Sequence, residues 1–339
     1  MAKHTSMKLT VAQEFELEQE RVRRRVFLFK FVPLAILALL VISFGILTPQ
    51  FLQFENIYTN ILDIAAVSII LGVGITPVVL TGAIDLSLEG FLGFGACFFA
   101  VFIQNSRTGY DWGIGAVLLT LIVVTVIGGI SGAIHVYLKL PSFMVTFAIG
   151  YILKGVGLLT YMGVPGTITD EGFRNLYFHT FLKLPITTWI AFGIFLIGLF
   201  LEKRTAFGRY VYAIGDNEQI PLMSGIHTSR VKILVFMWSG FCCGAAGLVA
   251  AAKLGYCIMS MGSGTLFPTL TAVVVGGTLL TGGVGGVVQT IIGVFIVTVI
   301  NNGMVMLGVD STLQSAVQGI ILLLAVVIAS MNSRDKVVK

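Results

Sequence analysis

Residues 112–137 read WGIGAVLLTLIVVTVIGGISGAIHVY, a run of 26 residues without a single Asp, Glu, Lys or Arg. An α-helix rises about 1.5 Å per residue, so this run is longer than the roughly 30 Å that a helix needs to cross the hydrocarbon core of a bilayer. The stretch therefore predicts a transmembrane helix.

The rest of the chain has the same character. Of its 339 residues, 56% are hydrophobic and 11% are charged, and the mean hydropathy is +0.97. Soluble domains are about one quarter charged, so this chain has too few charges to cover a water-facing surface. Its 40 glycines suit a membrane bundle, in which small residues let helix backbones approach closely. We expect an all-α fold, a polytopic transmembrane helix bundle.

About ten apolar runs are candidate spans. They are 31–48, 57–80, 88–103, 112–137, 143–162, 186–201, 232–252, 267–281, 286–307 and 313–330. Two of them, 88–103 and 267–281, are short for a complete crossing. These two are predicted to be half-helices or re-entrant segments, which occur where the backbone lines a cavity inside the bundle.

An even number of spans places both termini on one side of the membrane. With the termini inside, sixteen Lys and Arg residues fall in the inner segments and four in the outer loops. Inner loops are enriched in these residues, so we expect cytoplasmic N- and C-termini. No small-residue cleavage site follows the first apolar run, which begins near Phe31, and we therefore expect no cleaved signal peptide.

The spans divide the chain into three parts: a cytoplasmic arm (1–30), a transmembrane permease domain (31–330) and a cytoplasmic tail (331–339). In the arm, acidic residues come early, basic residues late, and apolar residues recur at helical spacing. This pattern favours an amphipathic helix near anionic lipid of the inner leaflet; a simple topology anchor is the alternative.

Two long polar stretches interrupt the spans. The external loop 163–185 carries mixed charges and aromatic residues, so it is either a folded loop that contacts a partner or a plain connector. The cytoplasmic loop 202–231 contains Asp216 or Asn217 as a cap for a short helix, Pro221 early in that helix, and Gly225 as its stop. Such a helix could receive force from a soluble motor protein, although an inert loop is the commoner case.

The sequence offers no catalytic motif. It lacks a Gly-Lys dipeptide and therefore a phosphate-binding loop, and it has neither a GxSxG nor an HExxH motif. The four cysteines lie in or beside apolar stretches without C-x-x-C spacing, so neither a metal site nor a disulfide framework is predicted. We expect no enzyme and no cofactor bound by this chain.

Three segments together carry a family resemblance: GAIDLSLEG (82–90), TAFGRYVYAIGDNE (205–218) followed by SGI (224–226), and AVVVGGTLLTGGVGG (272–286). They resemble the permease subunits of bacterial ABC sugar importers of the ribose/xylose/galactose type. The ending 301–328 fits the same group, and segment order and spacing match from about residue 50 onward.

The resemblance implies a multi-pass protein of the bacterial inner membrane. Its implied partners are a second permease subunit (homodimer or heterodimer), a cytoplasmic twin-cassette ATPase that binds ATP and Mg, an external solute-binding protein and membrane lipid, but no nucleic acid. In that family the loop equivalent to 208–226 docks onto the ATPase. The matching positions here are Gly208, Tyr212, Gly215, Asn217, Glu218, Ser224 and Gly225.

The chain departs from the family pattern at three places. Gln219, Ile220 and Pro221 stand where Glu-Ala-Ala is usual, and Glu89 stands where glycine is usual. The acidic residue usual before the AVVxGGT segment is also missing. An acidic residue at position 89 could alter the chemistry of the pathway.

Polar side chains within spans are costly in hydrocarbon and suggest an interior or pathway role. Asp63, Lys154 and Gln289 belong to this group, and Lys154 is expected to pair with a carboxylate. The pathway candidates are Asp85, Ser87, Glu89, Phe143, Thr146, Asn301 and Asn302. Asp85 could instead cap the next helix, the two asparagines could be hydrogen-bond partners between helices, and Phe143, Thr146 and Tyr151 could be core residues.

These observations favour a permease subunit of an ATP-driven importer for a simple sugar or related small polar solute. An ion-coupled secondary transporter that uses the buried carboxylates is the alternative. A membrane scaffold or receptor without transport activity is a third class.

Overall fold

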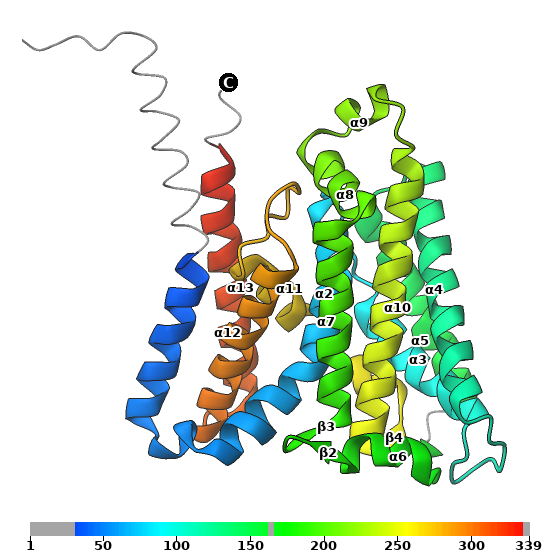
Figure 1. Cartoon of the computed structure of the whole chain (residues 1–339), viewed down its shortest axis with the longest axis vertical. Helices are drawn as coiled ribbons and strands as arrows, with labels where there is room; N and C mark the ends of the chain where they lie inside the picture. Colours follow the sequence, from blue (N-terminus) through cyan, green and yellow to red (C-terminus); the bar gives the residue numbers. More distant parts are fainter. Residues whose placement is uncertain (1–30, 162–165, 335–339) are drawn as a thin grey trace, which may run out of the picture.

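The computed structural model describes residues 31–161 and 166–334, and the predicted amphipathic arm 1–30 lies outside these residues. The described residues fold almost entirely into helices, with only four strands of two residues each (Figure 1). The expected all-α bundle is confirmed.

The elements follow one another along the chain with few long connections. They are the helix Phe31–Leu47, η1 (Pro49–Leu52), η2 (Asn56–Leu62), α2 (Asp63–Leu80), α3 (Leu88–Phe102), α4 (Ile114–Tyr137), α5 (Ser142–Tyr161), β1 (Gly166–Thr167), α6 (Glu171–Phe178), β2 (Thr180–Phe181), β3 (Leu184–Pro185), α7 (Ile186–Arg204), α8 (Ala206–Asn217), α9 (Gln219–Met223), α10 (Thr228–Leu254), β4 (Tyr256–Cys257), η3 (Met259–Gly262), α11 (Leu266–Val275), α12 (Val287–Met306) and α13 (Ser311–Arg334). β1 pairs with β4 and β2 with β3, both antiparallel.

Each predicted apolar run overlaps an apolar helix. Among the described residues, six helices are long and apolar enough to cross a membrane, namely Asn56–Leu80, Ile114–Tyr137, Ser142–Thr160, Ile186–Arg204, Thr228–Leu254 and Val287–Met306. Four apolar helices are shorter, namely Phe31–Leu47, Leu88–Phe102, Met259–Val275 and Ser311–Val327.

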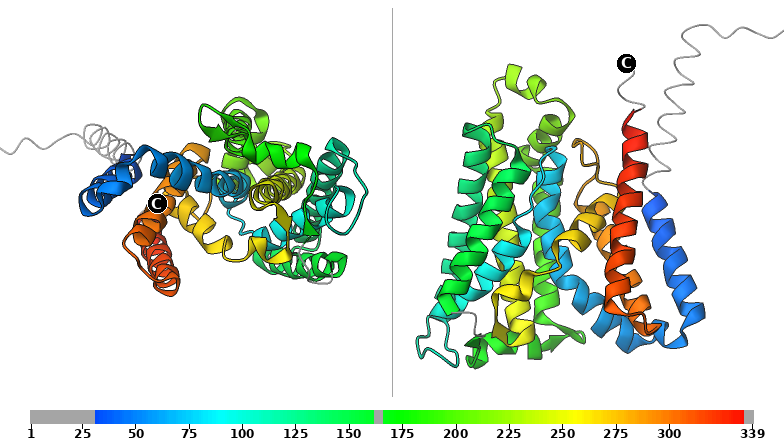
Figure 2. Two further views of the ribbon diagram at one scale, coloured as in Figure 1. Left: turned by 90° about the horizontal axis from the view of Figure 1, so that it is seen from below. Right: turned by 180° about the vertical axis from the view of Figure 1, so that it is seen from behind.

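The helices form two groups that α2 joins. Seen from below, the helix Phe31–Leu47 and α11 to α13 lie on one side, and α3, α4, α5, α7 and α10 lie on the other (Figure 2). The α8–α9 segment and the last turns of α13 lie at one end of the bundle, and α6 with β2 and β3 lies at the opposite end (Figure 1).

The larger group is held by close backbone contacts. A Cβ atom at Gly240 of α10 would lie 2.6 Å from the carbonyl oxygen of Val124 in α4, and one at Gly128 would lie 2.5 Å from the carbonyl oxygen of Phe236. Any side chain there would force the two helices apart. Small residues thus allow α4 and α10 to pack along most of their length, as in other membrane bundles.

Two helices are broken, as the short runs predicted. After α2 ends at Leu80, the chain runs through a segment without helix, 81–87, before α3 begins at Leu88. α11 has ten residues, which at about 1.5 Å per residue span about half of the hydrocarbon core. We call 81–87 the re-entrant segment and 276–286 the glycine loop.

The predicted run 267–281 was too long, because the helix ends at Val275. Gly276 and Gly277 follow directly, and Gly277, Gly282 and Gly283 have φ values of +107°, +86° and +74°. Glycine populates this left-handed region easily, whereas other residues disfavour it. The glycines therefore end the helix although the run stays apolar.

Candidate functional site

The polar loop 202–231 folds into two short helices. The predicted short helix is α9: Oδ1 of Asn217 accepts a hydrogen bond from the backbone N–H of Gln219 at 3.0 Å, Pro221 lies inside the helix, and Gly225 follows it with φ +78°. The sequence reasoning missed α8. Its signal was the apolar spacing of Val211 and Ile214 with Gly208, all of which are buried.

The inner face of α8 contacts both non-helical segments of the bundle. A Cβ atom at Gly215 would overlap the carbonyl oxygen of Leu80 and would lie 2.5 Å from the backbone nitrogen of Gly283. The N–H of Gly283 in turn donates to the carbonyl oxygen of Leu80 at 2.9 Å. Gly215 thus lies where the re-entrant segment begins and where the glycine loop crosses it.

Hydrogen bonds add to this contact. The hydroxyl of Tyr212 in α8 donates to the carbonyl oxygen of Gly285 in the glycine loop at 2.8 Å. The N–H of Val287, the first residue of α12, donates to Oε2 of Glu202 near the end of α7 at 2.5 Å. Lys203 lies 2.8 Å from the other oxygen of Glu202. These bonds join α7, α8 and the start of α12.

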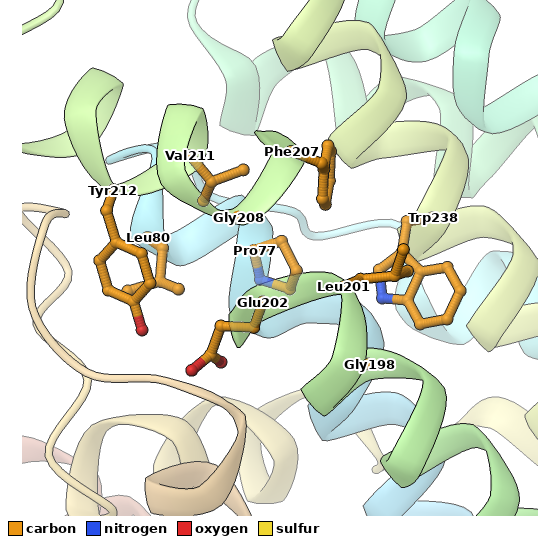
Figure 3. A pocket seen from close by; sticks show the side chains of 10 residues that line it. All are labelled: Pro77, Leu80, Gly198, Leu201, Glu202, Phe207, Gly208, Val211, Tyr212 and Trp238. Atoms are coloured by element: carbon orange, nitrogen blue, oxygen red, sulfur yellow. The ribbon is translucent and has the colours of Figure 1, made fainter. Parts of the chain in front are cut away.

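A cavity of about 10 Å³ separates these elements, roughly the space of one water molecule. In Figure 3, the Tyr212 hydroxyl and the Glu202 carboxylate extend toward the same side of the cavity, and Gly208 lies on α8 above it. Burial, followed by the negative charge of Glu202, raises the pKa of Tyr212 above its ordinary value. The phenol therefore stays protonated and remains a donor.

The outer part of this segment faces away from the bundle. Ile220, Leu222 and Met223 of α9 are 59%, 52% and 88% exposed, although all three are apolar. Asn217, Ser224 and Gly225 are also exposed, and Glu218 forms an ion pair with Lys232 at 2.7 Å. The seven residues carried over from the family motif thus divide between an inner set, Gly208, Tyr212 and Gly215, and an outer set around α9.

The polar residues Asp85 and Ser87 of the re-entrant segment are buried, and their side chains are bonded within the bundle. Oδ1 of Asp85 accepts from the backbone N–H and the hydroxyl of Ser87, and Oδ2 accepts from Ser239 of α10 at 2.7 Å. Asp85 and Ser87 are 2% and 1% exposed. In this conformation the two residues fasten the segment to α10. Ser87 directly precedes α3. Both hydrogen bonds that Oδ1 of Asp85 accepts therefore come from the residue just before that helix.

α5 holds the same segment from the other side. Oγ1 of Thr146 accepts from the N–H of Leu86 at 2.9 Å, and the hydroxyl of Ser142 accepts from the N–H of Ile84 at 3.0 Å. Thr146 is fully buried, whereas Phe143 lies on the outside of α5 and is 49% exposed. Thr146 therefore supports the backbone of the re-entrant segment, and Phe143 points away from it.

The carboxylate partner of Lys154 is Glu89, at 3.0 Å between Nζ and Oε2. Oε1 of Glu89 accepts from the N–H of Gly264, in the loop before α11, at 3.0 Å. A single charged side chain at the centre of a membrane helix costs about 2.5–3.5 kcal/mol. The opposite charge of the partner lowers this cost for both Glu89 and Lys154. The pair connects α3, α5 and the loop that leads to α11.

The two asparagines lie beside a cavity of about 250 Å³ between α2, α11 and α12. Asn60, Ser68, Thr298, Asn301 and Asn302 provide polar groups to its wall, and the remaining lining is apolar. Asn302 also exchanges two hydrogen bonds with Asn56, at 2.9 and 3.0 Å. Asn301 accepts from Gln318 of α13 at 2.8 Å. The asparagines thus bond between helices and line the cavity.

A further polar cluster joins four helices near the opposite end of the bundle. Asp63 of α2 is 3% exposed and lies 2.7 Å from Nζ of Lys253 in α10. Tyr177 of α6 and Thr188 of α7 donate to its two carboxylate oxygens at 3.3 and 3.4 Å. Burial, followed by the charge of Asp63, raises the pKa of Tyr177. The cluster attaches the polar stretch containing α6 to the bundle.

The geometry so far is that of a membrane bundle with broken helices and a helical segment that contacts them from one end. Residues 57–326 match the protein family described as "Branched-chain amino acid transport system / permease component". The chain belongs to this permease family. This result accounts for the broken helices, since permeases commonly place non-helical backbone where a cavity is lined.

Curated relatives agree with the assignment. The ribose import permease of Bacillus subtilis (strain 168) is 35% identical over 93% of this chain and 97% of its own length. A probable ABC transporter permease of Escherichia coli (strain K12) is 32% identical over 86% and 87%, and the autoinducer 2 import system permease of Salmonella paratyphi B is 31% identical over 86% and 82%. No solved structure matches.

The chain is therefore a permease subunit of an ABC importer. With its apolar helices it is an integral protein of the bacterial cytoplasmic membrane. The resemblance to sugar importers in the sequence is confirmed at the level of the family.

Proposed function

We propose that this permease forms half of the passage of an ATP-driven importer for a sugar or related small polyol. Its ten apolar helices all enter the membrane, with both termini and the α8–α9 segment in the cytoplasm. A second permease subunit, identical or related, completes the passage. A solute-binding protein docks on the external end, where residues 166–185 fold, and a twin-cassette ATPase docks on α9.

One observation carries the proposal: α8 contacts the re-entrant segment and the glycine loop at the same point. Gly215 lies against Leu80 and Gly283, and Tyr212 bonds to Gly285. A displacement of α8 by a partner would therefore move the ends of two broken helices together. This is how work done on a soluble ATPase could open and close a passage that the permease alone keeps shut.

The ATP and Mg belong to the partner in this proposal. The chain has no phosphate-binding loop, so nucleotide chemistry has to come from another polypeptide. The exposed apolar residues of α9 supply a surface for that partner, because side chains such as Met223 gain by burial at a protein interface.

The distribution of charge supports the orientation. The loop 202–231 contains Lys203, Arg204, Arg209 and Arg230, and its helices α8 and α9 lie at one end of the bundle (Figure 1). The positive-inside rule assigns this end to the cytoplasm.

Two observations support a sugar or related polyol as the solute: the names of two relatives and the polar groups that line the interior cavity. Two relatives carry ribose and autoinducer 2 in their names. The cavity beside Asn301 and Asn302 offers amide and hydroxyl groups without a net charge. Such groups suit the hydroxyls of a neutral solute.

The test is reconstitution in proteoliposomes with the cognate ATPase and binding protein. We expect uptake of D-ribose or a related sugar that requires ATP and all three components and that continues in the presence of a protonophore. Uptake by the permease alone would contradict the proposal, and uptake that a protonophore abolishes but ATP depletion does not would favour the ion-coupled alternative.

Docking has its own test. A cysteine in place of Ser224 should crosslink to the ATPase and should react with an impermeant thiol reagent only in inside-out vesicles. The matched control is a cysteine in place of Phe181, an exposed residue at the opposite end. It should react only in right-side-out vesicles. Labelling of the Ser224 position from outside would refute the orientation.

A further inference from the structure

The Glu89–Lys154 pair is unusual among the polar groups of the bundle because it is not fully covered. The side chain of Lys154 is 34% exposed and that of Glu89 is 18% exposed, whereas Asp85 and Asp63 are almost completely buried. Lys154 is the thirteenth residue of the 20-residue helix α5, about 18 Å from its first residue and about 10 Å from its last. The exposed charge thus lies within the membrane-spanning part of α5.

Hydrocarbon cannot be the neighbour of this exposed charge. Ionisable groups at such depth face the interior of a bundle, a water-filled space or another protein surface. Lys154 has three N–H donors, and within the described residues the structure gives it one hydrogen-bond acceptor, Oε2 of Glu89. Its remaining donors are available on the open side of α5.

Aromatic rings flank the pair on the same face. Tyr151 and Phe147 precede Lys154 by three and seven residues, which places all three side chains on one side of the helix. The two rings have their centroids 4.7 Å apart and are 60% and 52% exposed. The Lys154 ammonium lies 5.5 Å from the centre of the Tyr151 ring. The face therefore combines flat apolar surfaces with a donor and an acceptor.

We infer that Glu89, Lys154, Tyr151 and Phe147 form a solute subsite in the passage, which takes a neutral polyhydroxylated solute. The ammonium donates to a hydroxyl oxygen and the carboxylate accepts from a hydroxyl, while the rings cover the apolar C–H face of the solute. Because the two opposite charges cancel, the site has no net charge. It therefore does not favour a charged solute over a neutral one. This inference deepens the proposed function and depends on it.

The subsite also lies next to the loop that leads into α11. Oε1 of Glu89 holds Gly264, and a Cβ atom at Gly262 would lie 2.9 Å from the Cα of Glu89. A solute hydroxyl that bonds to Glu89 shares this carboxylate with the N–H of Gly264. The subsite is thereby connected to the loop that leads into α11.

The test uses the full chain, purified and placed in lipid nanodiscs, and a water-soluble thiol reagent. Leu158→Cys places a thiol four residues from Lys154, on the same face and next to the subsite. Ile152→Cys is the matched control, because Ile152 is exposed on α5 but two residues from Lys154, on the opposite side. The native cysteines are all buried, so they give little background.

We expect the reagent to modify the Leu158→Cys variant much faster than the Ile152→Cys variant, and D-ribose to slow the modification. The concentration of D-ribose that gives half protection should rise about tenfold when Glu89→Gln is added, since a hydrogen bond to a charged group is worth about that factor. Asp310→Asn, in an exposed loop, should leave it unchanged.

Two outcomes would overturn the inference: equal rates for the two cysteines, or a Leu158→Cys rate that D-ribose does not alter. ATP-driven uptake by the wild-type assembly is measured separately, so a failure of the subsite is distinguishable from a failure of the proposed function.

Discussion

The hydroxyl of Tyr212 donates a hydrogen bond to the carbonyl oxygen of Gly285, 73 residues further along the chain, at 2.8 Å. It is a direct polar link between the α8–α9 segment and the glycine loop. α12 begins two residues after Gly285. A displacement of α8 would therefore pull on the chain directly before α12. This relationship makes the proposed coupling accessible to mutation.

Tyr212→Phe removes the link without changing the shape of the side chain. A hydrogen bond of this kind contributes about 1 kcal/mol, so we expect ATP-driven uptake to fall roughly fivefold while the protein still folds. Tyr210→Phe is the control on the same helix. Uptake assays in proteoliposomes and thermal unfolding in detergent separate the two effects, and equal uptake by both variants would contradict the proposed link.

Gly215→Ala tests the contact between α8 and the re-entrant segment. The added methyl group would overlap the carbonyl oxygen of Leu80, so α8 has to shift outward. Overpacking costs typically about 1–3 kcal/mol. We expect a lower unfolding temperature and a marked loss of uptake. Gly193→Ala in α7 has open space around its Cβ position and should leave both quantities near the wild-type values.

The sequence was sufficient to predict the apolar helices and their breaks, because hydrophobic length and glycine content are local properties. It could not predict which groups would meet across the bundle. Lys154 was expected to pair with a carboxylate, but its pairing with Glu89 depends on how α3 and α5 pack. In the same way, Gly215 was identified from a family motif, while its contact with Leu80 and Gly283 follows only from the tertiary fold.

One helix was missed, and the role of one side chain was left open, by the sequence reasoning. α8 was missed although Phe207, Val211 and Ile214 recur at helical spacing, because it lies inside a stretch that was interpreted as a polar loop. Thr146 was a candidate either for a solute contact or for a core residue, and in the structure its hydroxyl accepts a hydrogen bond from the backbone N–H of Leu86. A threonine on a helix carries no local signal of whether it faces a cavity or another segment.

Glu202→Ala examines the bond that fixes the start of α12. The N–H of Val287, which is 1% exposed, would lose its acceptor. A buried donor without a partner costs about 1–3 kcal/mol, and we expect the thermal stability to fall accordingly. Glu202→Gln keeps an acceptor oxygen and should cost less. Lys203→Ala is the control, because the Lys203 side chain is 51% exposed and exposed ion pairs contribute little. A stability loss for Lys203→Ala as large as that for Glu202→Ala would argue against this assignment.

Lys253→Met should be the most destabilising of these substitutions, because it leaves the Asp63 carboxylate buried without its cation. Asp63 is 3% exposed, and its other two partners, Tyr177 and Thr188, are neutral donors at longer distances. Breaking a buried pair by removing one partner costs about 3–5 kcal/mol, whereas replacing both charges is often nearly neutral.

The double variant Asp63→Asn with Lys253→Met should therefore regain most of the lost stability. Thermal unfolding of the wild type, both single variants and the double variant gives the interaction energy as a double-mutant cycle. If the double variant is destabilised by the sum of the single effects, the two charges do not interact. The contact of α2 with α10 near this end of the bundle would then depend on apolar packing alone.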